Sequence, residues 1–255
     1  KYRLLAESVS DVVFVQRLDF TLEYVSSSVT PVTGWGVEEV LGIHRYRPET
    51  AERRRLAGFA TGLMITPTGG DILFVEATRM PGKGDIHVTG KVGTVMSEAA
   101  ATAVSLVRSR ADRLGLDPEW LRKIDLHVHV PRVGAPHDAA SLGVTLFVAV
   151  ASLLLKASVR PDVALTGELT LRGSVLPIAG VKAKVLAAHR AGLRAVVLPA
   201  RNAADLEEVP REVRDDLVIH LVQRLDEILP LVLAEPDATP GEGHEAPPPA
   251  ELSST

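Results

Sequence analysis

The chain has 255 residues, a hydrophobic content of 46% and a formal net charge of −4, enough apolar material for one large or two small domains. The acidic balance argues against a nucleic-acid partner. The absence of cysteine excludes a disulfide framework, a thiolate zinc site and a cysteine nucleophile, and it favours a reducing compartment, so we expect a cytoplasmic protein.

Residues 1–44 are predicted to form a separate N-terminal segment. Tyr2–Val15 is predicted as a short helix running into a strand, Thr21–Val25 as a second strand, and 26–42 as a turn with a short helix. The stretch YVSSSVTPVTGWGVEEVLG (24–42) resembles the early part of a PAS sensory domain. At most half of such a domain would be present.

Residues 60–90 are predicted as a β meander. The segment 72–77 is mostly apolar and is predicted as a strand, the turn Pro81–Gly84 follows, and 85–89 is predicted as the return strand.

A long helix is predicted over 92–114, ended near Gly115. Four small or aliphatic residues repeat there at helical spacing and predict its buried face: Val95, Ala99, Ala103 and Val107.

A strand is predicted over 124–130, because apolar and polar residues alternate there. His127 and His129 share its polar face, and two imidazoles so placed can bind a metal. Without a convincing third ligand, we expect no metal site.

Ser141 stands just before the apolar run 144–155, which is predicted as a buried core helix because 12 residues are too few to span a bilayer. With no longer apolar run in the chain, we expect no membrane association. The unpaired N–H groups and the dipole at a helix start favour an anion, which suits the nucleophile of an acyl-transfer enzyme. The alternative is that Ser141 is only a helix cap.

The segment 163–192 is predicted as a strand that ends at Thr166, a hairpin, and a helix over 181–190 that carries Lys182 and Lys184. A lysine can serve as the base for a serine only if it is neutral, which requires desolvation worth roughly 4 kcal/mol. Periodicity does not choose between the two lysines, and either could instead be a solvated surface residue.

The rest of the chain is predicted to hold strands at 195–198 and 216–222, a helical segment at 203–208 and a closing helix at 223–234. Residues 235–255 are rich in proline, glutamate and serine and are predicted to be a disordered tail. The sequence has no phosphate-binding G-x-x-x-x-G-K-[ST] loop, so we expect no cofactor in this chain.

Residues 45–234 resemble the proteolytic domain of the Lon family of ATP-dependent serine proteases. The resemblance implies an α+β fold with mixed β-sheets and packed helices, and serine endopeptidase activity. The matching stretches are ATGLMITPTGGDILFVEATRMPGKG (60–84), LHVHVP (126–131), DAASLG (138–143), DVALTGELTLRGSVLPIAGVKAKVLAAHRAG (162–192) and RNAADLEEVP (201–210).

Carried over residue by residue, the resemblance implies a Ser–Lys dyad of Ser141 and Lys184. Thr166 corresponds to the family's threonine beside the lysine, and Asp138 to its aspartate before the serine. The family's Gly-Pro before the serine is Ala139-Ala140 here, so the loop that shapes the oxyanion hole is altered. The alternative is a catalytically inactive Lon-like domain that acts as an oligomerisation scaffold.

The resemblance also implies unfolded proteins as substrates and a homohexameric ring. ATP and magnesium are expected only for an ATPase module upstream of this chain. Residues 30–46 could correspond to the end of that module instead of to a PAS segment.

Overall fold

The computed structural model describes residues 11–16, 22–33, 56–66, 69–90, 93–131 and 140–234. The chain divides into two compact units, Lys1–Glu52 and Arg53–Thr255. The predicted domain boundaries at residues 44 and 234 stay predictions.

The first unit contains a small antiparallel pair, β1 (Phe14–Gln16) and β2 (Leu22–Val25), followed by α2 (Val29–Thr33). The Val13 N–H, just before β1, donates a 2.9 Å hydrogen bond to Ser26 Oγ, just after β2, which holds the start of β1 to the end of β2. The predicted second strand is confirmed. The first ten residues and the segment 34–55 lie outside the described residues, and the PAS resemblance stays a prediction.

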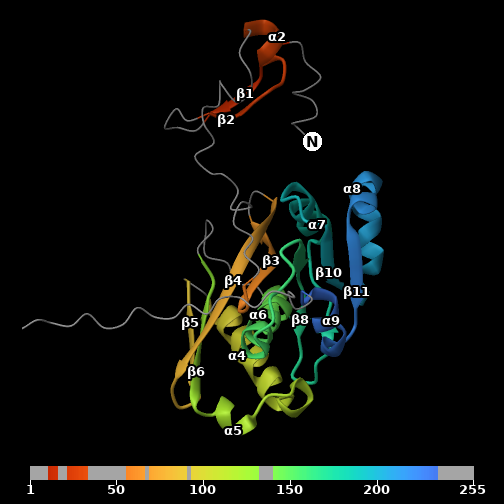
Figure 1. Cartoon of the computed structure of the whole chain (residues 1–255). Helices are drawn as coiled ribbons and strands as arrows, with labels where there is room; N and C mark the ends of the chain where they lie inside the picture. Colours follow the sequence, from red (N-terminus) through yellow and green to blue (C-terminus); the bar gives the residue numbers. More distant parts are fainter. Residues whose placement is uncertain are drawn as a thin grey trace, which may run out of the picture. The chain divides into compact units, whose positions relative to one another are not determined.

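The second unit is built on a mixed sheet, which has the order β11-β10-β7-β3-β4-β6-β5 in the part of the chain that the structure describes (Figure 1). The β3–β4 and β4–β6 pairs are antiparallel and the others are parallel. A short antiparallel hairpin, β8 with β9, stands apart from it. The strands are β3 (Phe59–Thr66), β4 (Gly69–Pro81), β5 (Ile86–Thr89), β6 (Ile124–His129), β7 (Val163–Leu165), β8 (Glu168–Leu169), β9 (Val175–Leu176), β10 (Ala195–Pro199) and β11 (Val218–Val222).

Helices cover both faces of this sheet, and α6 and α7 follow the bounds predicted for them closely. The helices are α4 (Thr94–Ser109), α5 (Pro118–Leu121), α6 (Gly143–Leu155), α7 (Val181–Arg190), α8 (Arg211–Asp216) and α9 (Leu229–Val232). The 3-10 segments are η2 (Asp112–Leu114), η3 (Ala140–Leu142), η4 (Ala200–Glu208) and η5 (Leu225–Glu227), of which η4 is the longest.

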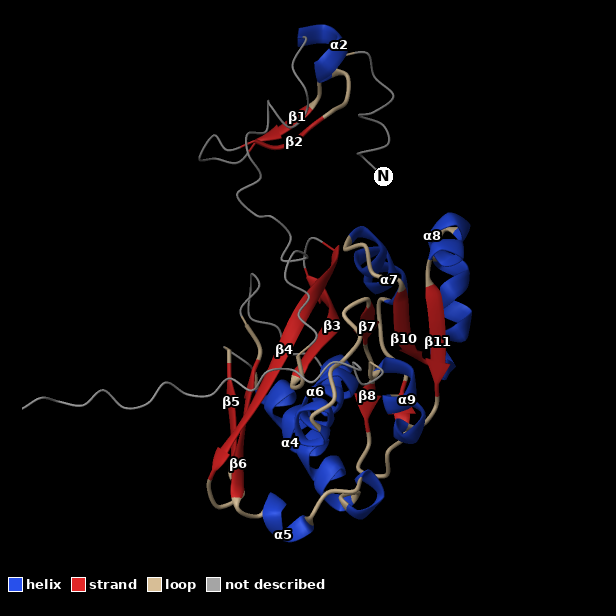
Figure 2. Cartoon of the chain, in the orientation of Figure 1, coloured by secondary structure: helices blue, strands red, loops and turns tan. Residues whose placement is uncertain are grey.

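The sheet separates two hydrophobic cores. Adjacent residues of a strand point to opposite faces, so Met64 joins the core under α4 and α6, whereas Leu63 joins the core under α7 and α8. Figure 2 shows α4 and α6 lying together against the sheet. Residues 143–152 of α6 are all buried, which confirms the predicted core helix. The mixed sheet with packed helices confirms the predicted α+β class.

The predicted return strand at 85–89 forms, but its predicted partner is wrong. β5 pairs in parallel with β6 and not with β4, because β6 lies between them. Asp125 at the start of β6 explains this pairing. Its Oδ1 accepts hydrogen bonds from the N–H groups of Lys83, Gly84 and Asp85 at 2.7–2.9 Å, which holds the turn over β6.

Three other details differ from the sequence-based predictions. The closing helix at 223–234 is two short turns, η5 and α9. The strand predicted from Asp216 begins at Val218, because Arg211–Asp216 is helical. The long helix is confirmed, but Val95 is 40% exposed, since the buried stripe is centred on Ala103 and Val107.

No helix in the described part of the chain is long and apolar enough to cross a membrane.

Candidate active site

Ser141 lies in the 3-10 turn η3, directly before the first turn of α6, and is partly exposed. The helix begins at Gly143, where a Cβ would lie 3.1 Å from the backbone nitrogen of Leu169 and 3.3 Å from the carbonyl oxygen of Gly167. A side chain at Gly143 would therefore press on the segment that follows β7. The glycine lets the start of the helix, and with it Ser141, approach that segment closely.

Backbone hydrogen bonds fix Ser141 to the end of β7. The N–H of Gly167 donates to the carbonyl oxygen of Ser141 at 2.7 Å, and the N–H of Val144 donates to the carbonyl oxygen of Gly167 at 2.9 Å. A Cβ at Gly167 would meet Val144 Cγ2 at 2.8 Å, so this crossing also needs a glycine. These two hydrogen bonds hold the segment of Ser141 against the segment that follows β7.

Thr166, at the end of β7, is completely buried and links Ser141 to Lys184. Its hydroxyl donates to the carbonyl oxygen of Ser141 at 3.1 Å and accepts a hydrogen bond from Lys184 Nζ, also at 3.1 Å. The structure therefore brings these three predicted site residues together around a single hydroxyl group.

The two candidate lysines have different environments. Lys184 is 2% exposed, on the face of α7 that also buries Val181 and Val185, whereas Lys182 is exposed. Desolvation by burial lowers the pKa of Lys184 from 10.5 to about 8. The amine of Lys184 is therefore neutral in a substantial fraction of molecules near pH 8, as a general base requires.

The β3–β4 hairpin braces α7 at the level of Lys184. An Arg190 Nη2 hydrogen bond of 2.6 Å reaches the carbonyl oxygen of Gly70. A Cβ at Gly70 would lie 2.0 Å from the carbonyl oxygen of Ala183, so only glycine permits this approach. Sequence reasoning missed the brace, for which the Gly-Gly pair at the start of β4 was the available signal.

Asp138 and Ala139 lie outside the described residues. Ala140, the second residue of the altered loop, is the first residue of η3.

The paired histidines of β6 contact a hydroxyl group. Thr89 Oγ1 lies 2.9 Å from His127 Nε2 and 2.7 Å from His129 Nδ1. Among the described residues, no three or more histidine, cysteine, aspartate or glutamate side chains are grouped so that they could hold a metal ion.

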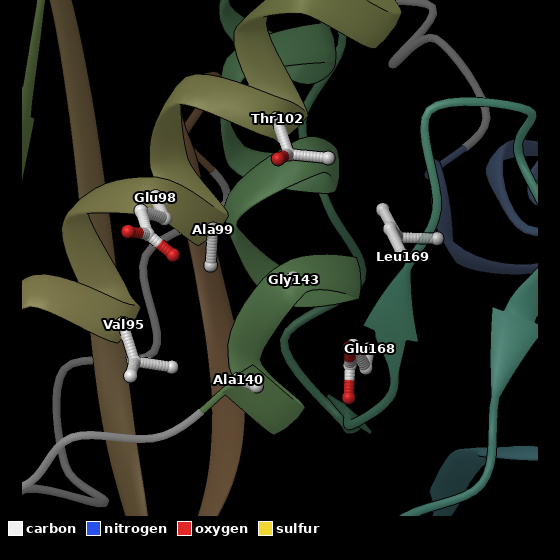
Figure 3. Close-up of a pocket in the computed structure, with 8 residues that line it drawn as sticks. All are labelled: Val95, Glu98, Ala99, Thr102, Ala140, Gly143, Glu168 and Leu169. Carbon is white, nitrogen blue, oxygen red and sulfur yellow. The ribbon is translucent and has the colours of Figure 1, made fainter.

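A pocket of about 140 Å³ opens beside the start of α6 (Figure 3). Ala140 and Gly143, on either side of Ser141 in sequence, form part of its wall, and α4 and β8 supply the rest. Sequence reasoning missed it because the pattern of α4 placed Val95 and Ala99 on the core face. The lining residues are Val95, Glu98, Ala99, Thr102, Ala140, Gly143, Glu168 and Leu169.

The sequence is similar to those of several Lon proteases. The chain is 61% identical over 206 residues to Lon protease 2 of Sorangium cellulosum (strain So ce56), a match that covers 81% of this chain and 26% of that protein. It is 51% identical over 199 residues to the Lon protease of Anaeromyxobacter dehalogenans (strain 2CP-C), covering 78% of this chain and 24% of that protein. It is 48% identical over 224 residues to Lon protease 2 of Myxococcus xanthus, covering 86% of this chain and 27% of that protein.

The chain thus spans about a quarter of the length of the curated relatives it matches. The model of the Lon protease (S16) C-terminal proteolytic domain matches residues 31–235 and so begins ahead of the predicted start at residue 45. The chain belongs to the Lon proteolytic domain family.

Proposed function

We propose that this chain is the proteolytic part of a Lon-type serine endopeptidase, with Ser141 as nucleophile and Lys184 as general base. The observation that carries the proposal is the buried amine of Lys184, which has a lowered pKa and is held by the hydroxyl of Thr166, itself bound to the backbone of Ser141. A serine, a desolvated lysine and an orienting third group are the parts that this kind of acyl transfer needs.

In the proposed reaction, Ser141 Oγ attacks the carbonyl carbon of the scissile peptide bond while neutral Lys184 takes its proton. The backbone N–H of Ser141 and a second nearby backbone donor stabilise the oxyanion. Lys184 then gives the proton to the leaving amine, the C–N bond breaks, and an acyl-enzyme forms on Ser141. A water molecule, deprotonated by Lys184, hydrolyses the ester and restores the free serine.

Thr166 is proposed to orient the amine of Lys184, and Asp138 to shape the loop before Ser141. The proposed substrates are unfolded proteins, and the proposed assembly is a homohexameric ring in the cytoplasm. ATP-driven unfolding of folded substrates would require an ATPase module upstream of this chain. We propose no cofactor, metal, nucleic-acid partner or membrane partner for the chain itself.

Peptide hydrolysis by the purified chain tests the proposal. Wild-type protein is expected to cleave casein or a fluorogenic peptide, and Ser141→Ala and Lys184→Met to abolish cleavage while their circular dichroism stays unchanged. The matched control is Lys182→Met, which removes an exposed lysine from the same helix and should retain activity. A folded wild-type chain without any hydrolysis would contradict the proposal and favour a scaffold.

A further inference from the structure

Thr145 and Ser152 are the two polar side chains in the buried part of α6, and they use their hydroxyl groups differently. A serine or threonine in a helix commonly donates to a carbonyl oxygen three or four residues earlier in the same helix. Ser152 does so, with a 3.0 Å hydrogen bond to Ala149. The Thr145 hydroxyl instead leaves the helix and donates a 3.0 Å hydrogen bond to the carbonyl oxygen of Leu165, the last residue of β7.

The usual acceptor within the helix is already occupied for Thr145. The residue four positions earlier is Ser141, whose carbonyl oxygen accepts hydrogen bonds from the Gly167 N–H at 2.7 Å and from the Thr166 hydroxyl at 3.1 Å. A backbone carbonyl oxygen has two lone pairs, so this acceptor is filled. The junction between Ser141 and the end of β7 therefore turns the Thr145 hydroxyl away from its own helix.

The sheet makes room for the Thr145 side chain at one glycine. Gly62 of β3 lies opposite Leu165 in the β3–β7 pair. A Cβ at Gly62 would lie 3.1 Å from Thr145 Oγ1 and 3.2 Å from Thr145 Cγ2, so a larger residue there would press on the threonine. Both Thr145 and Leu165 are completely buried, which shields their hydrogen bond from bulk water.

The Thr145 hydrogen bond holds the peptide unit that joins Leu165 to Thr166. A peptide unit is planar, so holding the groups at both of its edges sets its orientation. The carbonyl oxygen of this unit accepts from Thr145, and its N–H donates to the carbonyl oxygen of Val197 in β10 at 3.1 Å. The direction of the Thr166 side chain depends on this plane, and its hydroxyl holds the amine of Lys184.

We propose that Thr145 is a positioning residue for the Ser–Lys pair, because its hydroxyl fixes the peptide unit that sets the direction of the Thr166 hydroxyl. The inference rests on the proposed function, to which it adds a residue of the helix core that does not touch the reacting atoms. Without this bond, the buried carbonyl of Leu165 loses a partner and the peptide unit is held less firmly. A misaligned Lys184 slows proton transfer but leaves peptide binding unchanged, so the effect is expected on kcat.

Steady-state kinetics of Thr145→Val tests the inference, because valine has nearly the shape of threonine without the hydroxyl. The variant should lower kcat on a fluorogenic peptide by about three- to thirtyfold and change KM by less than about twofold. Thr145→Ser retains the hydroxyl and should recover most of the lost kcat.

The matched control is Ser152→Ala, which removes the other buried hydroxyl near the far end of α6. Ser152 Oγ accepts a 2.9 Å hydrogen bond from the Gly58 N–H, so this variant should lower the unfolding temperature. Its kcat should stay within about twofold of wild type, since Ser152 has no contact with the Thr166 peptide unit. The control separates a loss of core stability from a loss of alignment.

A double-mutant cycle shows whether Thr145 acts through Thr166. If it does, Thr145→Val in the Thr166→Ala background should change kcat by less than about twofold, because the hydroxyl that it positions is already gone. The rate at which a serine-directed probe labels Ser141 gives the same comparison where turnover is slow. An equally large fall in both backgrounds would overturn the inference.

The outcomes separate the two claims. A folded Thr145→Val protein with kcat within about twofold of wild type would overturn the inference and leave the peptidase standing. Equal losses of kcat in Thr145→Val and Thr145→Ser would also overturn it, since they would assign the effect to packing. If Thr145→Val does not fold, Thr145→Ala carries the same predictions. If folded wild-type protein cleaves no peptide, the proposed function fails and the inference fails with it.

Discussion

Lys184 Nζ donates a 3.1 Å hydrogen bond to Thr166 Oγ1, and both side chains are buried. The same hydroxyl donates to the carbonyl oxygen of Ser141. The amine is thereby held with its lone pair free for a proton, since the hydroxyl accepts an amine hydrogen and uses its own hydrogen on Ser141. This arrangement links the end of β7, which carries Thr166, to Lys184 of α7 on one side of the sheet and to Ser141 at the start of α6 on the other.

Replacing Thr166 with alanine is expected to lower kcat with little change in KM. The variant loses a buried hydroxyl that makes two hydrogen bonds, each worth roughly 1–3 kcal/mol when a buried partner is left unpaired, so kcat should fall by about ten- to a hundredfold. Steady-state kinetics on a fluorogenic peptide measures this. Thr166→Ser retains the hydroxyl and should recover most of the activity; equal losses in both variants would assign the effect to packing instead.

The activity is expected to rise with pH through the pKa of Lys184. Desolvation lowers this pKa to about 8, and the proposed base is active only when neutral. The kcat/KM should therefore increase about tenfold per pH unit below about 8 and level off above it. A pH profile of peptide hydrolysis measures the midpoint, with Lys182→Met as the control that leaves it unmoved. A profile that is flat between pH 6 and 9 would exclude Lys184 as the titrating base.

Lys184→Met is expected to stabilise the protein near pH 7 although it removes the activity. The pKa of Lys184 is about 8 in the folded protein and 10.5 in the unfolded chain. The unfolded chain therefore binds more protons between these values, and stability rises with pH across that window. At pH 7 the buried ammonium costs roughly 3 kcal/mol.

Methionine removes that cost but also the hydrogen bond to Thr166, so the net gain in the free energy of unfolding should be about 1–2 kcal/mol. Urea denaturation at pH 7 and at pH 9.5 measures it. The gain should be smaller at pH 9.5, where the lysine of the wild type is largely neutral. A variant that is less stable than wild type at both pH values would show that Lys184 contributes to the fold as a cation.

Asp125→Ala is expected to loosen β5 from the edge of the sheet. The backbone N–H groups of Asp85, Lys83 and Gly84 bind Asp125 and lower the pKa of its carboxyl below 3.8. The stabilisation is therefore present above pH 3.8 and is lost as the pH falls through the lower, folded-state pKa. Hydrogen exchange of the amides in 83–89 should accelerate in the variant, while the amides of α6 keep their protection. Unchanged exchange in 83–89 would show that the β5–β6 pairing alone holds the strand.

The sequence predicted most elements of the second unit, because their signals are local. The apolar run of α6, the alternation of β6 and the glycine that ends α7 each follow from residues within one segment. The position of β5 could not be predicted in this way, since it depends on an aspartate that lies 40 residues away in sequence from the N–H group of Asp85. Pairing of distant segments is set by such contacts and not by strand propensity.

The candidate site was predictable in part for the same reason. The position of Ser141 directly before the apolar run of α6 made it a candidate nucleophile. Helical periodicity left Lys182 and Lys184 equivalent, and only the resemblance chose between them. In the structure the two differ through burial, which depends on how α7 packs against the sheet. The pocket with Glu98 and Glu168 was not predictable, because it is formed by α4 and β8, which are distant in sequence.

Covalent labelling of the serine tests the central claim most directly. The folded chain is treated with a serine-directed phosphonylating probe, and the modified residue is located by mass spectrometry, with Ser141→Ala, Lys184→Met and Lys182→Met treated in parallel. The account predicts a single modified site at Ser141 in wild type and in Lys182→Met, no label in Ser141→Ala, and strongly slowed labelling in Lys184→Met. Folded wild-type protein that takes up no label at Ser141, or takes it up at the same rate without Lys184, would contradict the Ser–Lys mechanism.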